Sequence, residues 1–228
     1  MVAKCGEVRV WHWAHKGRLL CDPWWENETE WHRAWKDQFP VHWQEIVHRA
    51  GDGERHVADV KTGDGWVIEF QHSHIKPEER RSREDFYRKL IWVVDGARRK
   101  RDKAQLIKAW KEGASVGQNS LVRKAFSDAC GLLREWAGSN APIFFDLGVE
   151  ALWWLFAMSS VGSAYLVPLP RAQFIFWHRS PATETARQFD AFVTDIPKLI
   201  AEYESHLRAQ PLRWDPLQPR RPRRHFRF

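Results

Sequence analysis

The chain has 228 residues, with 36 Lys and Arg against 29 Asp and Glu, which gives a net charge of +7 at pH 7. That length allows a sizeable core, and the positive excess favours a polyanionic partner, nucleic acid first, over the alternative of a mildly basic protein without one. Three cysteines do not suggest a disulfide framework, residues 1–10 lack the apolar region of a signal peptide, and no apolar run reaches the roughly 18 residues that a membrane helix needs. We therefore expect a cytoplasmic protein with no membrane partner.

The N-terminal segment, residues 1–27, is predicted to contain strand structure and four potential zinc ligands. The ligands follow the spacing C-x6-H-x2-H-x5-C and are Cys5, His12, His15 and Cys21. Zinc favours such sulfur and nitrogen ligands, although the paired C-x2-C of strong zinc motifs is missing. The alternative is that both histidines lie on a strand beside tryptophans, with buried free thiols nearby.

Residues 28–39 are predicted to form a helix with two stripes. Asn27 is a suitable N-cap, and Pro40 marks the end of the helix. An apolar stripe recurs at every fourth residue and holds Trp31, Trp35 and Phe39. A polar stripe has the same spacing and holds Glu28, His32 and Lys36. The polar stripe is either a solvated face or the side of the helix that faces the hairpin carboxylates described below.

A β-hairpin is predicted over residues 57–73, preceded by a strand or short helix over residues 41–48. The first hairpin strand carries Asp59, a Gly-Asp-Gly turn follows at residues 63–65, and residues 66–71 form the second strand. Because side chains alternate along a strand, Glu69 and Gln71 share a face, and the neighbouring strand can bring Asp59 beside them. Two carboxylates and an amide oxygen form the hard-oxygen site that magnesium prefers.

Two basic segments follow the hairpin. Residues 76–90 are predicted to be a charged helix, residues 91–95 a buried strand, and residues 96–113 a second basic helix. The candidate phosphate contacts in these segments are Arg80, Arg81, Arg83, Arg98, Arg99, Lys100 and Arg101. The alternative for each is an exposed position, paired with nearby acids or simply solvated.

The C-terminal half is predicted to extend the α/β architecture. Residues 114–140 look irregular to helical, and four apolar stretches within residues 143–177 are predicted strands that extend the sheet or form a subdomain. Residues 183–209 are predicted to be a helix with a stripe of Phe189, Phe192, Ile196 and Ile200. The expected divisions are a strand segment at 1–27, a core at 28–112, an α/β extension at 113–210, and a flexible Pro/Arg tail at 211–228 that is a candidate nucleic-acid-binding element.

The order of five motifs resembles the competence protein CoiA family of bacteria, whose core is similar to the PD-(D/E)-x-K nuclease fold. The motifs are HWAH at 12–15, ETEWHRAWK at 28–36, RHVADV at 55–60, IEFQHSHI at 68–75, and REDFY at 83–87 followed by IWVVDG. The resemblance covers about residues 8–97. It implies an α/β, restriction-endonuclease-like core with a central mixed four-stranded sheet flanked by helices, and additional strands and a helix C-terminal to it.

The resemblance implies a nuclease that hydrolyses DNA phosphodiester bonds with Mg²⁺ or Mn²⁺. Asp59, Glu69 and Glu28 would hold the metal, and the implied catalytic set is Glu28, His32, Lys36, Asp59, Glu69 and Gln71. Gln71 stands where the commonest pattern has lysine, although the resemblance also includes E-x-Q. A glutamine cannot deprotonate water but can orient it by hydrogen bonds, so the group that activates water is left open. His32 and Lys36 are preferred for that role over His72 and His74 because they share the stripe of Glu28.

The implied setting is DNA uptake and recombination or defence against foreign DNA. Many nucleases of this fold pair two active sites, so a homodimer is considered. The alternative function is a DNA-binding factor that kept the fold, lost catalysis, and holds single-stranded DNA through its basic helices and tail.

Overall fold

The structure is a computed structural model that describes residues 2–4, 12–14, 28–49, 55–156, 162–179 and 184–209. In the N-terminal segment, β1 (Val2–Lys4) and β2 (His12–Ala14) form a two-stranded antiparallel sheet. The zinc candidates Cys5, His15 and Cys21 lie outside the described residues, as does the tail at 211–228, and of His12 the backbone alone is described.

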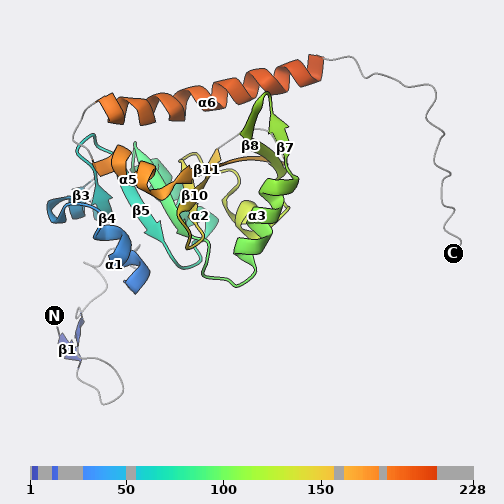
Figure 1. Cartoon of the computed structure of the whole chain (residues 1–228). Helices are drawn as coiled ribbons and strands as arrows, with labels where there is room; N and C mark the ends of the chain where they lie inside the picture. Colours follow the sequence, from blue (N-terminus) through green and yellow to red (C-terminus); the bar gives the residue numbers. More distant parts are fainter. Residues whose placement is uncertain are drawn as a thin grey trace, which may run out of the picture.

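A nine-stranded mixed sheet forms the centre of the molecule (Figure 1). From one edge to the other, its strands are β3 (Gln44–Arg49), β4 (Arg55–Lys61), β5 (Val67–Gln71), β6 (Leu90–Asp95), β9 (Ile143–Asp146), β10 (Ala151–Phe156), β11 (Ser163–Pro170), β8 (Asn119–Phe126) and β7 (Ala114–Val116). The three strands β5, β6 and β9 run parallel to one another, and every other neighbouring pair is antiparallel. The predicted α/β class with a mixed sheet is therefore confirmed.

The predicted number of strands in the central sheet is wrong. Instead of four strands, nine form one continuous sheet, because β9 pairs with β6 in parallel from Trp92↔Ile143 to Asp95↔Asp146. All four residues of β9 and all six of β6 are buried. Strands of this kind need helices over both faces and neighbours on both edges. The C-terminal strands therefore extend the sheet and do not form a separate subdomain.

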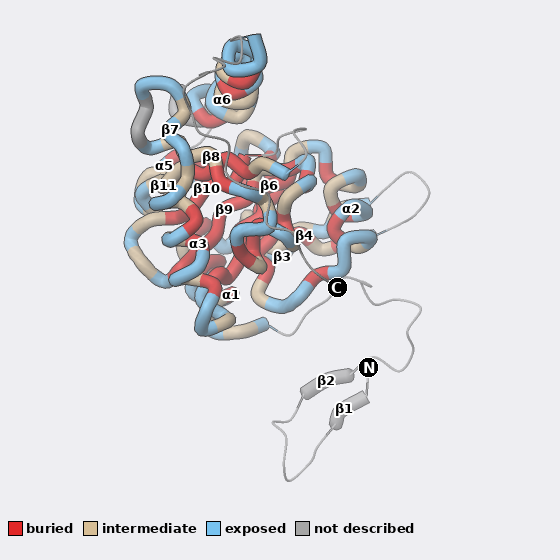
Figure 2. Tube along the Cα trace, turned by 90° about the vertical axis from the view of Figure 1, so that its right-hand side faces the viewer, coloured by how far each residue is buried: buried red, intermediate tan, exposed pale blue. Residues whose placement is uncertain are grey.

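Helices cover both faces of the sheet and enclose two apolar cores. On one face α1 (Glu30–Lys36), α5 (Arg171–Arg179) and α6 (Glu184–Ala209) pack over a core that includes Phe70, Phe144 and Phe174. On the other face α2 (Pro77–Phe86), α3 (Asp102–Glu112) and α4 (Gly131–Trp136) pack over a core that includes Trp92 and Phe145. Figure 2 shows the buried chain running through the middle of the molecule, with exposed segments outside it.

Several local predictions need correction. Residues 41–43 form a short 3-10 helix before β3, so the segment 41–48 is a helical turn followed by a strand. The segment 114–140, predicted to be irregular to helical, is helical at α4 but also contains the strands β7 and β8. The apolar stretch FIFWH at 174–178 lies in helix α5, where Phe174 and Trp177, three residues apart, are buried on one helix face. A short apolar run does not by itself distinguish a buried strand from a buried helix.

The long helix α6 is tied to the sheet at both ends and crosses the top of the molecule in Figure 1. Trp66 Nε1–H donates to Asp190 at 2.8 Å, and Lys124 Nζ donates to Glu204 at 2.8 Å. Of the predicted apolar stripe, Phe189 and Ile200 are buried, whereas Phe192 is 42% exposed. No helix within the described ranges has the length and apolar character needed to cross a membrane.

Candidate active site

The first turn of α1 fixes the start of the polar stripe. The N-cap is Thr29 and not Asn27, which lies outside the described residues, so Glu28 immediately precedes the cap. The hydroxyl of Thr29 accepts from His32 N–H at 3.3 Å, and the His32 ring binds back to Thr29 through Nδ1. The other ring nitrogen, Nε2–H, donates to the Phe70 carbonyl at 2.5 Å. His32 therefore joins α1 to β5, and both of its ring nitrogens are engaged.

A buried carboxylate, Asp146 at the end of β9, holds the apolar side of α1. Its Oδ2 accepts from the indole N–H groups of Trp31 at 3.0 Å and Trp35 at 2.9 Å. Its Oδ1 accepts from Arg171 at 2.5 Å and from the backbone of Gly148 at 2.9 Å. With four donors on one carboxylate, the helix is held in a fixed rotation over the sheet. This rotation turns the polar stripe of α1 toward the hairpin.

The hairpin opens at the candidate carboxylates. Strands β4 and β5 pair at Val60↔Ile68 and Lys61↔Val67, and the ladder does not continue to Asp59 and Glu69. In place of a ladder hydrogen bond, Asp59 Oδ2 accepts from the Phe70 backbone N–H at 2.9 Å. The carboxylate of Asp59 therefore lies at the mouth of a fork between two strands, with Oδ1 directed at α1.

Lys36 joins three carboxylates at this fork. Its Nζ lies 3.0 Å from Glu28 Oε1, 3.0 Å from Glu45 Oε1 and 3.5 Å from Asp59 Oδ1. The Lys36 side chain is 9% exposed, whereas that of Glu28 is 40% exposed. The prediction that the polar stripe of the first helix faces the hairpin is confirmed by these contacts.

The cluster affects the pKa values of Lys36 and Asp59. Burial alone would lower the pKa of Lys36, but the negative charges of Asp59, Glu28 and Glu45 outweigh burial and hold it above its usual value. Burial raises the pKa of Asp59, and this is opposed by the Phe70 N–H and by the nearby positive groups Lys36, His32 and Arg83. Asp59 is a partly buried carboxyl, 24% exposed, whose charged form is stabilised by the cations around it.

Glu45 belongs to the cluster although the sequence did not single it out. Its backbone is left-handed, with φ of 52°, which few residues other than glycine adopt and which costs about 1–2 kcal/mol. The ladder partners on either side of it are Gln44↔Val60 and Ile46↔Ala58, so Glu45 lies opposite Asp59. Strain at this position brings its carboxylate to Lys36. The sequence pattern of β3 alone does not indicate that Glu45 has a left-handed backbone or contacts Lys36.

Glu69 and Gln71 point to the other face of the sheet, as predicted for residues that alternate with Ile68 and Phe70. Glu69 Oε2 accepts from Arg83 Nη1 at 3.1 Å, and Arg83 Nη2 donates to Glu79 at 2.6 Å. The amide of Gln71 donates to the carbonyl of Ser73 at 3.3 Å and to its hydroxyl at 3.4 Å. Both Glu69 and Gln71 are buried. The two candidate carboxylates are thus paired with cations from different helices, Asp59 with Lys36 of α1 and Glu69 with Arg83 of α2.

Asp59 and Glu69 are suitable ligands for a divalent cation, but in the structure they are paired with Lys36 and Arg83. Within the described ranges, no three His, Cys, Asp or Glu side chains converge as a ready metal site. The donor chemistry is nevertheless suitable, because three carboxylates share the single ammonium of Lys36 and leave an excess of negative charge. A divalent cation between Asp59 and Glu69 would displace Lys36 from Asp59, the longest of its three contacts, and would replace Arg83 at Glu69.

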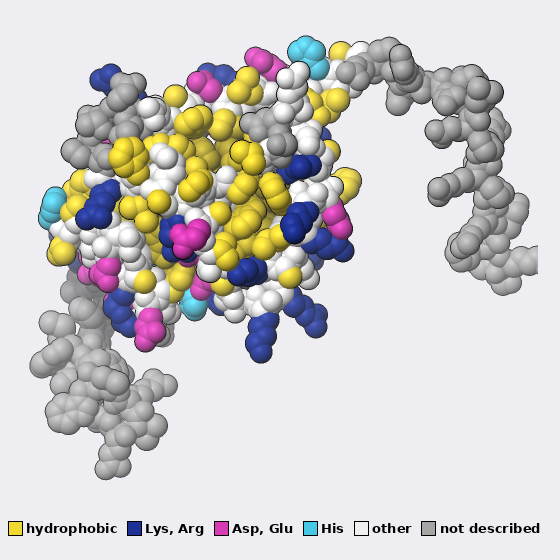
Figure 3. All heavy atoms as spheres, viewed as in Figure 1, with side chains coloured by type: hydrophobic (Ala, Val, Ile, Leu, Met, Phe, Trp, Pro, Cys, Tyr) yellow, Lys and Arg dark blue, Asp and Glu magenta, His cyan; other side chains and the backbone are white. Residues whose placement is uncertain are grey.

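The predicted phosphate contacts fall into two groups. Arg80 and Arg83 are 5% and 4% exposed, and Arg80 donates to the Glu135 carbonyl while its guanidinium lies over Trp136. Arg99 is bound to Asp102 and Glu135. The exposed members of the set are Arg81, Arg98, Lys100 and Arg101. In Figure 3 the Lys and Arg side chains of one face surround an apolar centre and do not fill one continuous groove.

Comparison with known proteins finds no matching family model, no similar curated protein and no similar solved structure. The functional argument therefore depends on the arrangement of side chains around the fork.

Proposed function

We propose that the protein is a metal-dependent nuclease of restriction-endonuclease-like fold, similar to the CoiA family, that hydrolyses DNA phosphodiester bonds. The observation that carries the proposal is the convergence of Lys36, Glu28 and Asp59 at the mouth of the β4–β5 fork, beside Glu69. Lys36 lies in α1, Asp59 in β4 and Glu69 in β5, whereas Glu28 immediately precedes the N-cap of α1. The stability of the fold does not by itself require these charged side chains to meet at one place. The mixed sheet formed by β3, β4, β5 and β6, with α1 and α2 on its two faces, supports the finer fold assignment.

In this proposal Asp59 and Glu69 hold Mg²⁺ or Mn²⁺, with Glu28 supporting them from the residue before the N-cap of α1. The metal would polarise the phosphoryl oxygen and lower the pKa of a bound water. Lys36 is the group that replaces the lysine missing at Gln71, because its ammonium reaches Asp59 from the helix instead of from β5. A protonated lysine suits stabilisation of negative charge on the phosphate better than removal of a proton from water. His32 fixes the helix against Phe70 and is a positioning residue.

Cleavage of labelled linear, circular and single-stranded DNA in Mg²⁺ or Mn²⁺ tests the proposal. We expect the wild type to cut at least one substrate, chelation to stop the reaction, and Asp59→Asn or Glu69→Gln to lower the rate at least about a hundredfold. Asp59→Asn keeps an oxygen that can accept from Phe70 N–H, so the hairpin is preserved. Glu30→Gln, an exposed acid on the same helix, is the matched control and should cut normally. Equal cutting by wild type and Asp59→Asn would reject this site, and no cutting of any substrate would reject the nuclease.

The second candidate function is a DNA-binding factor without catalysis. The observation that favours it is that Asp59 and Glu69 are already paired with Lys36 and Arg83, so the cluster is complete without a metal. Binding of Mn²⁺ measured by calorimetry separates the two functions. A nuclease should bind Mn²⁺ in the wild type and lose it in Asp59→Asn, whereas a binding factor should bind DNA equally in both and show no Mn²⁺ site in either.

A further inference from the structure

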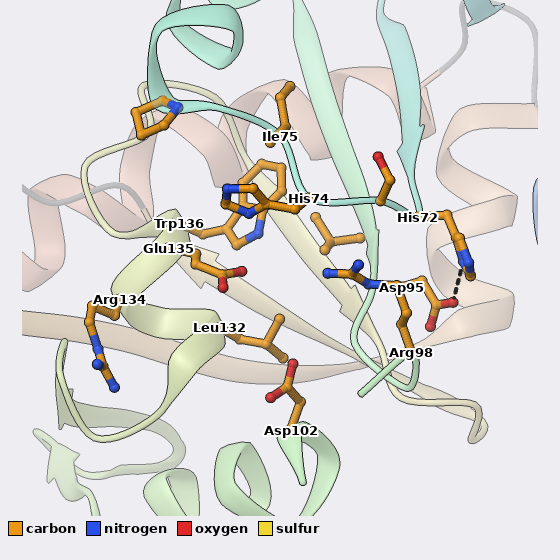
Figure 4. A pocket seen from close by; sticks show the side chains of 13 residues that line it. His72, His74, Ile75, Asp95, Arg98, Asp102, Leu132, Arg134, Glu135 and Trp136 are labelled. Carbon is orange, nitrogen blue, oxygen red and sulfur yellow. Dashed lines mark hydrogen bonds and ion pairs between the residues drawn. The ribbon is translucent and has the colours of Figure 1, made fainter. Parts of the chain in front are cut away.

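A cavity of about 250 Å³ lies at the carboxyl ends of β5 and β6, on the face that α2, α3 and α4 cover. It is formed by the segment after β5, the end of β6, the turn before α3, and α4 (Figure 4). The residues that define its chemistry are His72, Ser73, His74, Arg98 and Arg134, with Ile75, Leu132 and Trp136 as its apolar lining. Carboxyl ends of parallel strands are where open α/β sheets bind ligands.

The acids that line the cavity are already paired within the protein. Asp95 accepts from His72 Nδ1–H at 2.7 Å and from the Ala97 N–H at 2.9 Å. Asp102 and Glu135 each accept from the same guanidinium, that of Arg99, at 2.5 Å. Each acid of the lining is therefore engaged by hydrogen-bond donors of the protein, and the single charge of Arg99 is shared between two carboxylates.

Three basic groups of the lining, unlike His72, have no such partner. Arg98, Arg134 and His74 form no ion pair with any acid in the part of the chain that the structure describes. Figure 4 shows the guanidinium of Arg98 and the ring of His74 pointing into the cavity, with Arg134 at its rim. The groups of the lining that remain available to a ligand are therefore the guanidinium groups of Arg98 and Arg134 and the ring of His74, over an apolar floor, and these suit an anion such as a phosphate.

The cavity adjoins the candidate active site through two residues. Ser73 lines the cavity, and both its hydroxyl and its carbonyl accept from the amide of Gln71. Gln71 follows Glu69 by two positions on the same strand and the same face. A strand of nucleic acid with one phosphate at Glu69 and Asp59 would therefore pass the mouth of this cavity.

We propose that this cavity binds a second phosphate of the nucleic-acid strand, next to the phosphate that is cleaved, through Arg98, His74 and Ser73. The inference rests on the proposed nuclease function for the identity of the strand, but the phosphate site itself does not. The volume is below the roughly 300–1,000 Å³ of pockets that hold a whole small-molecule ligand, so one phosphate with part of its sugar fits better than a complete cofactor.

Inorganic phosphate and a short single-stranded oligonucleotide are the probes. Imidazole resonances of His74 are followed by NMR during a phosphate titration of the full chain carrying Asp59→Asn, which prevents cleavage. We expect them to shift, Arg98→Gln to abolish the shift, and Arg88→Gln to leave it intact. Arg88 is the matched control because it is an exposed arginine that neither lines the cavity nor belongs to the candidate phosphate contacts. With the oligonucleotide, Arg98→Gln should weaken binding about tenfold and reduce the salt dependence by about one phosphate contact.

The outcomes separate this inference from the nuclease. Unmoved His74 resonances, or equal effects of Arg98→Gln and Arg88→Gln, would overturn the cavity as a phosphate site even if Asp59-dependent cleavage is found. A phosphate-dependent shift that Arg98→Gln removes would support the site even if the chain cuts no DNA. Phosphate binding without competition by the oligonucleotide would show that the ligand is a free phosphate and would overturn the strand assignment.

Discussion

His178 provides a sharp test of the packing described here. It lies on α5 and is 1% exposed, between the rings of Phe174 at 4.6 Å and Phe189 at 4.3 Å. Both of its ring nitrogens are buried and have no hydrogen-bond partner in the described part of the chain. Burial lowers the pKa of His178 from 6.5 to about 3. The imidazole is therefore neutral in the folded protein and must lose its environment before it can be protonated.

The direction of the pH dependence follows from this shift. In the unfolded chain the imidazole binds a proton below its ordinary pKa of 6.5, whereas in the folded protein it does so only near pH 3. The free energy of unfolding is therefore highest above pH 6.5 and falls as the pH decreases toward 3. At pH 5 the loss is about 2 kcal/mol, because 1.5 pH units below 6.5 correspond to about 1.4 kcal/mol each.

Urea unfolding of the wild type and His178→Phe at pH 7.5 and pH 5.0 measures this effect. Phenylalanine cannot titrate, so we expect the stability of the variant relative to the wild type to rise by about 2 kcal/mol between the two pH values. Comparing the change with pH removes the packing cost of the larger ring, which is the same at both. His42→Phe, at an exposed position, is the control and should follow the wild type. A constant difference between His178→Phe and the wild type would show that His178 is not buried as a neutral ring.

Two further substitutions test how the candidate site is held. Asp146→Asn removes the charge that accepts from two indoles and a guanidinium, so we expect the free energy of unfolding in urea to fall by about 2–4 kcal/mol. Because α1 is then no longer held in place, we also expect a lower cleavage rate, even though Asp146 is not in the fork. Equal stability of Asp146→Asn and the wild type would contradict this role. Glu45→Gly should be at least as stable as the wild type, whereas Glu45→Val should be about 2 kcal/mol less stable, since a β-branched residue tolerates the left-handed backbone poorly; the reverse order in thermal melting would refute the strain.

Local features of the site were predictable because they depend on residues close in the sequence. The turn at 63–65 brings β4 and β5 together, and fourfold spacing aligns His32 with Lys36 on one side of α1, whereas Glu28 reaches Lys36 from before the N-cap. The convergence of that stripe with Asp59 followed from the resemblance and the hairpin together. Both predictions used patterns in which position in the chain fixes position in space.

Features that depend on distant segments were not predictable in the same way. Asp146 lies 111 residues after Trp35, and no periodicity links the two, although the Asp-x-Gly turn after a buried strand was a sign of a special position. Arg80 and Arg83 look like surface charges in the sequence, yet α4 and the acidic partner at Glu69 bury them. The parallel pairing of β6 with β9 joins residues about 50 positions apart, so the number of strands could not be counted from the first hairpin.

The position of Lys36 bears on why glutamine stands at position 71, where the proposed nuclease pattern most commonly has lysine. A lysine at position 71 would be buried on the same face as Glu69, where Arg83 already supplies a positive charge at 3.1 Å. A second cation there would add repulsion between like charges in a desolvated place. On the other side of the fork, Asp59 receives its positive charge from α1, through Lys36 at 3.5 Å. The two carboxylates of the fork therefore contact cations from different helices, and a neutral amide at position 71 avoids a further cation beside Arg83.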